Sequence, residues 1–220
     1  MAYSLYLAGF DVKDVMMTDL ITGRETLEDI NMIVFCGGFS NSDVLGSAKG
    51  WAGAFLYNPK AKEALDKFYA RKDTLSLGIC NGCQLMVELG LIESVERRVE
   101  SVEFATAHET SAERTAVAAR PLVACYQRDA RNSKLYTLNS TLRARMLHND
   151  SHKFESGFLT LQIPENRSVM FGSLSGSKLG IWVAHGEGKF SLPGQESDYH
   201  VVAKYNYHGY PANPNGSDYR

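Results

Sequence analysis

The sequence predicts an α/β domain whose core is a doubly wound, mostly parallel sheet. Residues 30–36 and 75–79 are short apolar runs rich in Ile, Val and Leu, as expected of buried parallel strands. A helical pattern covers residues 59–71, and another opens at Gln84 and continues to Leu89. Strands that alternate with helices indicate βαβ units, in which working residues lie at the carboxyl ends of the strands.

The other elements are predicted in chain order. Residues 2–8 have the pattern of an amphipathic helix that ends at Gly9, and residues 10–15 alternate as in a strand. Three later strands and a turn-rich tail are expected at residues 158–163, 179–184, 200–205 and 209–216.

Residues 94–145 differ in composition from both flanks. They hold most of the arginines of the chain but only one lysine, Lys134, and their apolar residues show no period beyond a short helix near 112–120. We predict a solvated or poorly ordered insertion within a single domain of residues 1–220. A basic partner-binding insertion and a misread stretch of sequence are the alternatives.

Composition excludes several classes of function. A chain of 220 residues with 44% hydrophobic residues can bury a sizeable core, and its formal net charge of -2 favours neither nucleic acid nor an anionic membrane. The N-terminal segment lacks the basic region of a signal peptide, and no apolar stretch approaches the roughly 20 residues of a membrane helix. Four cysteines in such a chain indicate a reducing compartment, so we expect a cytoplasmic protein.

The segment Gly78-Ile-Cys80-Asn-Gly82-Cys-Gln84 places a cysteine between a predicted strand and a predicted helix. A nucleophile on such a sharp turn points into the cleft, and flanking glycines avoid crowding there. The helix N-terminus favours the thiolate. The backbone N–H of Asn81 can face an oxyanion, and the Gly37-Gly38 loop can supply a second donor. The pattern therefore predicts acyl transfer through a thioester on Cys80.

Two simpler interpretations of Cys80 compete with a nucleophile. A free cysteine is often a small core residue. Cys80 and Cys83 also form a C-x-x-C pair, which is typical of redox sites and of half a zinc site. Zinc needs further ligands, but Cys36 and Cys125 stand alone and no histidines have the required spacing, so we expect no metal site. The glycines and Gln84 favour the nucleophile.

These residues resemble the nucleophile elbow of class I (triad) glutamine amidotransferases, whose fold is flavodoxin-like. Four further segments resemble motifs of the branch that serves purine biosynthesis, in the same order, at residues 37–52, 148–156, 184–188 and 210–217. The resemblance implies that Cys80 is the nucleophile and that Gly38 and Asn81 donate their backbone N–H groups to the oxyanion. It also implies glutamine-binding side chains at Gln84, Asn149, Ser151 and Phe154.

The resemblance further implies an activity and a partner. Such a domain hydrolyses glutamine to glutamate and passes ammonia to an ATP-dependent synthetase domain, which converts formylglycinamide ribonucleotide to its amidine. ATP and Mg²⁺ are then expected in the synthetase domain, with no cofactor in this one.

The sequence departs from this family at its ends. The first strand of the family and the segment that carries its triad histidine and glutamate have no match, so we expect a fragment truncated at both ends with little turnover alone. His185 and Glu187 are expected to be structural or interface-forming, with a role as replacement base as the alternative. A non-catalytic docking remnant and a thiol-dependent hydrolase or redox protein on the same fold remain the other hypotheses.

Overall fold

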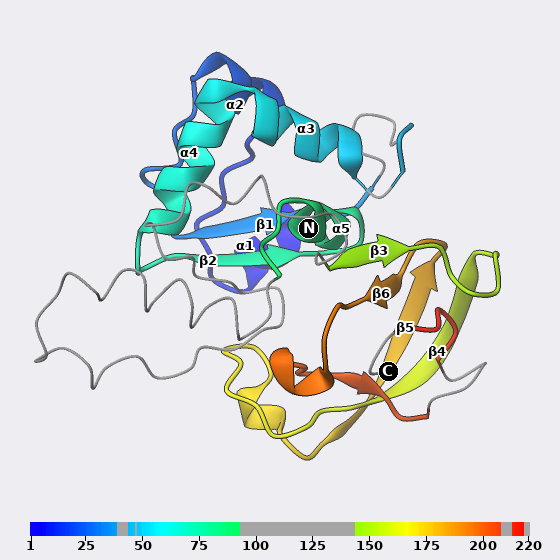
Figure 1. The fold of residues 1–220 in the computed structure, drawn as a ribbon. Coiled ribbons are helices and arrows are strands. Elements are labelled where there is room, and N and C mark those ends of the chain that lie inside the picture. The colour runs from blue at the N-terminus through cyan, green and yellow to red at the C-terminus, as the bar shows by residue number, and fades with distance from the viewer. Residues whose placement is uncertain (39–43, 47, 93–143, 208–212, 218–220) are drawn as a thin grey trace, which may run out of the picture.

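The computed structural model describes residues 1–38, 44–46, 48–92, 144–207 and 213–217 (Figure 1). Its first half contains helices and a parallel pair of strands, in the order α1 (Ala2–Leu7), α2 (Met17–Thr22), β1 (Met32–Phe35), α3 (Lys49–Tyr57), α4 (Pro59–Ala70), β2 (Leu75–Gly78) and α5 (Asn81–Glu88). Its second half is mainly strands, in the order β3 (Arg145–Leu147), β4 (Glu155–Gln162), β5 (Lys178–His185), β6 (Lys189–Ser191) and β7 (Lys204–Tyr205). None of the described helices has the length and apolarity of a membrane-spanning segment.

Strands β1 and β2 form the predicted parallel pair, in a register that runs from Met32 opposite Leu75 to Phe35 opposite Gly78. Helices α3 and α4 connect them, which gives the predicted alternation of strand and helix. In Figure 1, α2, α3 and α4 lie together on one side of the pair, and both strands point toward the side on which β3, β5 and β6 lie.

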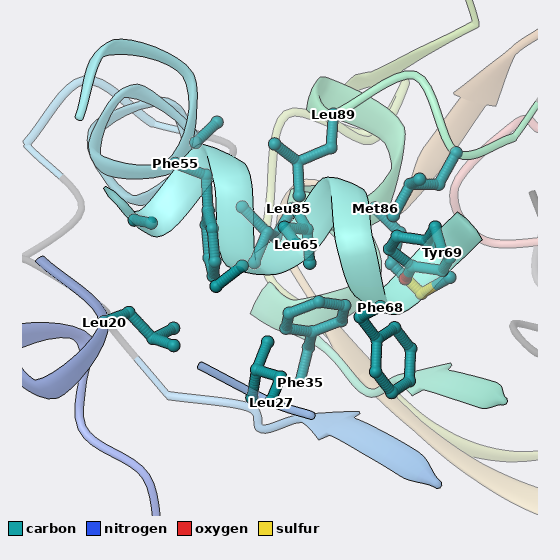
Figure 2. Close-up of a cluster of buried hydrophobic side chains, with 14 of the residues drawn as sticks. Leu20, Leu27, Phe35, Phe55, Leu65, Phe68, Tyr69, Leu85, Met86 and Leu89 are labelled. Carbon is teal, nitrogen blue, oxygen red and sulfur yellow. The ribbon is translucent and has the colours of Figure 1, made fainter. Parts of the chain in front are cut away.

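The buried core of the first half lies between this pair and the helices (Figure 2). Phe35 packs edge-on against Trp51 and Phe55 of α3, with ring centroids 6.0 and 6.1 Å apart. Phe68 of α4 and Leu85 of α5 are almost completely buried in the same cluster. Such burial stabilises the domain by about 1.5–3 kcal/mol for each large apolar side chain.

Helix α4 forms where the sequence predicts it. The side chain of Asn58 accepts a hydrogen bond from the backbone N–H of Ala61 at 3.0 Å, and Pro59 occupies the first helical position. Helix α5, by contrast, begins at Asn81, three residues before the predicted opening at Gln84, so the cysteine immediately precedes its first turn.

The second half is antiparallel in the described residues. Strand β4 pairs with β5 along its whole length, from Glu155 opposite His185 to Gln162 opposite Lys178, and β7 pairs with the other side of β4. Strands β3 and β6 form a separate antiparallel pair. The prediction of a mostly parallel sheet therefore describes only the β1–β2 pair among the strands that the structure describes.

Several predicted elements need correction or lie outside the structure. Residues 10–15 form no strand, because an alternating pattern defines two faces but supplies no neighbouring strand to pair with. The strand predicted at 200–205 is limited to β7. Of the insertion predicted at 94–145, only the last two residues are described, and Arg145 already belongs to β3.

Two glycines allow α5 to lie directly against the strands. A Cβ atom at Gly82 would overlap the backbone carbonyl of Phe35 in β1. A Cβ atom at Gly78 would lie 2.7 Å from both the carbonyl oxygen of Gly82 and the sulfur of Met86. Backbone atoms cannot move aside as a flexible side chain can, so position 82 requires glycine.

We therefore expect Gly82→Ala to lower the free energy of unfolding by about 3 kcal/mol or more, since overpacking of a well-packed site typically costs 1–3 kcal/mol even where side chains can adjust. Gly157→Ala is the matched control, because a Cβ atom there meets nothing within 4 Å. Urea unfolding of both variants measures the difference. Equal stabilities would contradict the close contact between α5 and β1.

Candidate functional site

Cys80 lies at the sharp turn between β2 and α5. Its backbone has φ 57° and ψ -116°. Residues other than glycine rarely adopt this conformation, which costs about 1–3 kcal/mol. Hydrogen bonds from Gly82 N–H to the Ile79 carbonyl at 3.0 Å and from Cys83 N–H to the Cys80 carbonyl at 2.9 Å hold the turn. The Cys80 side chain is exposed. A strained, accessible cysteine at a strand-to-helix turn is the geometry of a nucleophile elbow.

The loop that follows β1 lies against this cysteine. A Cβ atom at Gly37 would be 3.0 Å from Cys80 Cβ and 3.6 Å from its Sγ, so any side chain at this position would press closely against the cysteine. Gly38 has φ +115°, which also favours glycine. The predicted meeting of the two glycine-containing turns at the carboxyl ends of parallel strands is confirmed.

The second cysteine of the C-x-x-C pair has a different environment. Burial raises the pKa of the Cys83 thiol to about 11, with a smaller contribution from the neighbouring Cys80. Cys83 therefore stays protonated at neutral pH and is a poor partner for thiol exchange. In the described ranges no group of three or more His, Cys, Asp or Glu side chains is arranged to hold a metal ion.

Asn149 organises the polar turn at residues 185–188. Its side-chain amide is completely buried and donates to the carbonyl oxygens of Lys153 and His185, both at 2.8 Å. Its Oδ1 faces Nδ1 of His185 at 3.0 Å and accepts from the Gly188 N–H at 3.3 Å. The predicted glutamine-binding residue is thus placed inside the protein, where its amide supports the turn.

A third segment packs on the same turn. The Asn215 side chain donates to the Gly188 carbonyl at 2.6 Å, and the Ser217 hydroxyl donates to the same oxygen at 3.3 Å. The Asp150 N–H donates to the Asn215 carbonyl at 3.2 Å. The motifs at 148–156, 184–188 and 210–217, far apart in the sequence, therefore meet through hydrogen bonds of their described residues.

Gln84 joins this polar turn to the cysteine elbow. Its Nε2 donates to the Glu187 carbonyl at 3.0 Å, across 103 residues of sequence, and its Oε1 accepts from Nδ2 of Asn81 at 2.8 Å. Asn81 is buried and follows Cys80 directly. The elbow and the turn at 185–188 are thereby connected through one side chain.

Both ring nitrogens of His185 have partners. Nδ1 lies 3.0 Å from Oδ1 of Asn149, and Nε2 lies 3.5 Å from the hydroxyl of Tyr205. Burial lowers the pKa of His185, an effect that the carboxylate of Glu155 partly opposes. A role as base for Cys80 would require the ring to give up one of these contacts, so the structural interpretation of His185 is favoured.

The other predicted residues lie around the same turn. The carboxylate of Glu187 is 3.3 Å from Nδ1 of His148. A Cβ atom at Gly46 would lie 3.5 Å from the same carboxylate. The ring of Phe154 is largely exposed and lies beside Gly186. Ser151 is half-buried, and its hydroxyl accepts from the Lys153 N–H at 3.4 Å.

Sequence reasoning assigned no role to Asn215, Ser217 or Tyr205. The first two belong to a segment that was singled out for its turn composition and as one of the motifs of the resemblance, without a role for any of its side chains. Tyr205 carries no local signal, because its contact with His185 depends on the pairing of β7 with β4.

Comparison with known proteins identifies relatives along nearly the whole chain. Residues 1–117 and 134–220 match the family described as CobB/CobQ-like glutamine amidotransferase domain. A phosphoribosylformylglycinamidine synthase from Drosophila melanogaster is 37% identical over 225 residues, which cover 97% of this chain and 14% of that protein. A probable chloroplastic/mitochondrial phosphoribosylformylglycinamidine synthase from Arabidopsis thaliana is 37% identical over 193 residues, covering 88% of this chain and 11% of that protein. The chain thus spans 11–14% of the length of these relatives.

A solved structure of PurLQS from Thermotoga maritima also resembles the chain. The TM-score is 0.55 at 22% sequence identity, and the similarity covers 88% of this chain and 62% of that one. At this identity the comparison establishes a shared fold.

Replacement of Asn149 tests the buried turn. We expect Asn149→Ala to lower the free energy of unfolding by about 3 kcal/mol or more, because each buried partner left without a hydrogen bond costs about 1–3 kcal/mol. Asn206→Ala is the control, since Asn206 is only partly buried, and it should cost less than about 1 kcal/mol. Denaturant unfolding distinguishes the two, and similar losses would contradict the role of Asn149.

The lowered pKa of His185 predicts a pH dependence of stability. As the pH falls below 6.5, the ordinary pKa of histidine, His185 takes up a proton in the unfolded chain more readily than in the folded one. The unfolded state then binds more protons than the folded state, so the free energy of unfolding decreases as the pH is lowered. His185→Gln should show a shallower decline between about pH 6.5 and 5 in unfolding curves. A constant offset from the parent protein across this range would contradict the prediction.

Proposed function

Because the chain belongs to the CobB/CobQ-like glutamine amidotransferase family, we propose that it is the glutaminase part of a phosphoribosylformylglycinamidine synthase. The family predicted from the motifs is confirmed by this match. The fold is that of glutamine amidotransferases. We further propose that the sheet is doubly wound and flavodoxin-like, and that residues 1–220 form a single domain with an insertion.

The observation that carries the proposal is the strained, exposed Cys80 with Gly37 packed against it. The Cys80 thiolate attacks the side-chain carbonyl carbon of glutamine, and a tetrahedral oxyanion forms. The backbone N–H groups of Gly38 and Asn81 stabilise this oxyanion. The C–N bond then breaks, the departing nitrogen takes up the proton that the Cys80 thiol released and leaves as ammonia, and a thioester to Cys80 remains. Water hydrolyses the thioester to glutamate and regenerates the thiol.

The substrate lies, in this proposal, between the elbow and the segment that contains Ser151 and Phe154. Phe154 offers an exposed apolar surface beside the turn at 185–188, and Ser151 offers a hydroxyl. The ammonia passes to an ATP-dependent synthetase domain, which binds ATP and Mg²⁺. A cytoplasmic location belongs to the same proposal.

The base that activates Cys80 is not supplied by His185 in this proposal. Among the residues that the structure describes, the Cys80 side chain has no hydrogen bond to a histidine, and both ring nitrogens of His185 face other partners. Absence of a positioned base typically slows such a step by about 10²–10⁴-fold. We therefore propose that the 220-residue chain binds glutamine but turns it over slowly.

The alternative of a thiol-redox protein is less well supported. A dithiol exchange needs two accessible thiols with substantial thiolate character, whereas Cys83 is held protonated by its raised pKa. A non-catalytic docking role is distinguished by the experiment below.

A glutamine-like diazoketone tests the proposal directly. We expect it to alkylate Cys80 selectively, with glutamine in excess suppressing the reaction by about tenfold or more, as followed by mass spectrometry with peptide mapping. Cys36→Ser should label normally and Cys80→Ser should not. Equal labelling of all cysteines, or labelling that glutamine does not suppress, would contradict a glutaminase site and favour a docking role.

A further inference from the structure

We propose that three exposed aromatic side chains on the outer face of β4 and β5 form a docking surface for the synthetase part of a longer polypeptide. We call this surface the aromatic strip, and it consists of Phe154, Phe158 and Trp182. The inference rests on the proposed glutaminase function and adds to it the place where the partner that accepts ammonia binds.

The side chains of the aromatic strip share one face of the sheet. Successive residues of a strand point to opposite faces, so residues two or four positions apart point the same way. Phe158 lies directly opposite Trp182 in the antiparallel register, and their ring centroids are 5.3 Å apart. Trp182 is 76% exposed, Phe154 68% and Phe158 60%. Large apolar rings therefore lie on the surface of this chain.

Small residues of β5 lie among these rings. A Cβ atom at Gly180 would be 2.4 Å from the ring of Phe158, so this ring covers the backbone of β5 beside Trp182. Ala184 is exposed on the same face, two residues further along the strand. Because the neighbours of the rings are small, a partner has room to contact the rings themselves.

The opposite face of the same strands is already buried in part. Leu159 and Ile181 are half-buried there, and Val183 is buried. An antiparallel sheet with one face in water normally carries apolar residues on one face and polar residues on the other. Phe158 and Trp182 depart from this pattern at the centre of the outer face. Contiguous exposed apolar patches on proteins mark interaction sites, so the aromatic strip indicates a partner.

The surroundings of the aromatic strip have the composition of an interface rim. Thr160, Gln162 and Lys178 are exposed on the same face, beyond the rings. Interfaces combine a core enriched in aromatic residues with a polar rim, and tryptophan is prominent among the residues that contribute most to binding. In the described residues β5 also lies at the edge of its sheet, where a partner can add backbone contacts. The surface thus fits an apolar partner face with polar groups around it.

The length of the relatives indicates what that partner is. The chain matches 14% of one synthase relative and 11% of the other, so most of each polypeptide lies outside the matched region. In the proposed function that remainder includes the domain that receives ammonia. A partner in the same polypeptide is held at a high effective concentration, so a small aromatic surface is sufficient to bind it.

The position of the aromatic strip favours the same partner. Phe154 lies beside Gly186, since a Cβ atom there would be 3.8 Å from its ring. The turn that contains Gly186 is joined to the Cys80 elbow by the hydrogen bond from Gln84 to the Glu187 carbonyl. A domain bound to the strip therefore covers the sheet next to the glutaminase site, which shortens the path of ammonia.

The experiment compares the 220-residue chain alone with a chimera in which this chain replaces the matched region of the Drosophila relative. Hydroxyl-radical footprinting with mass spectrometry measures the oxidation rate of each aromatic side chain in both proteins. The rates at Trp182 and Phe158 should fall by about fivefold or more in the chimera, because the core of an interface excludes water. Tyr57, which is 87% exposed at the end of α3, should be oxidised equally in both proteins, and the buried Phe68 should stay unreactive.

A charge placed in the aromatic strip provides the second test. Thr160→Arg in the chimera should return the oxidation rates of Trp182 and Phe158 to those of the isolated chain, since an unpaired charge opposes docking of an apolar surface. Tyr57→Arg is the matched control and should leave the protection unchanged. Because Thr160 is exposed, Thr160→Arg in the isolated chain should unfold at the same urea concentration as the parent chain.

Three results would overturn the inference. Equal oxidation of Trp182 in the isolated chain and the chimera would show that the synthetase part does not cover the aromatic strip. Protection that survives Thr160→Arg would place the contact elsewhere. Protection in the isolated chain that disappears on dilution would assign the strip to a second copy of this chain.

The two proposals fail in different ways. If glutamine protects Cys80 from the diazoketone but Trp182 is not protected in the chimera, the docking surface alone is wrong. If Trp182 is protected but glutamine does not protect Cys80, the glutaminase function fails and the docking surface is supported.

Discussion

The backbone of α5 can lie directly against β1 only because residue 82 has no side chain. The helix starts one residue after Cys80, whose backbone has a positive φ of 57°. The same close approach brings Gly37, at the end of β1, against the cysteine. The exposed Cys80, its strained backbone and the neighbouring ends of β1 and β2 therefore all lie where α5 packs against β1.

The second half of the chain contains a polar turn at residues 185–188 that is bonded to a buried side chain. A buried amide without partners would cost several kcal/mol, whereas a fully bonded one is rigid and specific. Asn149 has partners for both its donor and its acceptor atoms, and the Gly188 carbonyl accepts from two other segments. Such a network holds together segments that lie far apart in the sequence. It also provides the fixed point from which Gln84 reaches the elbow.

The two cysteines of the elbow illustrate how environment decides chemistry. Cys80 and Cys83 are separated by less than one helical turn, but one is exposed at the helix start and the other has a pKa raised by burial to about 11. Sequence spacing alone leaves both a redox pair and a lone nucleophile open. Burial separates them, because it disfavours the thiolate at Cys83.

The sequence by itself determined the features that depend on local chemistry. The apolar runs at β1 and β2, the capped start of α4 and the glycine-flanked cysteine each follow from nearby residues, as does the membership of a glutamine amidotransferase family. It did not determine the fate of residues 10–15, which alternate as a strand does but have no neighbouring strand, nor the extent of the antiparallel sheet. Only the tertiary structure placed Gln84 against Glu187, buried the amide of Asn149 and paired His185 with Tyr205. These contacts join residues 20 to 103 positions apart, and no local pattern encodes a hydrogen bond whose partner is supplied by the packing of another segment.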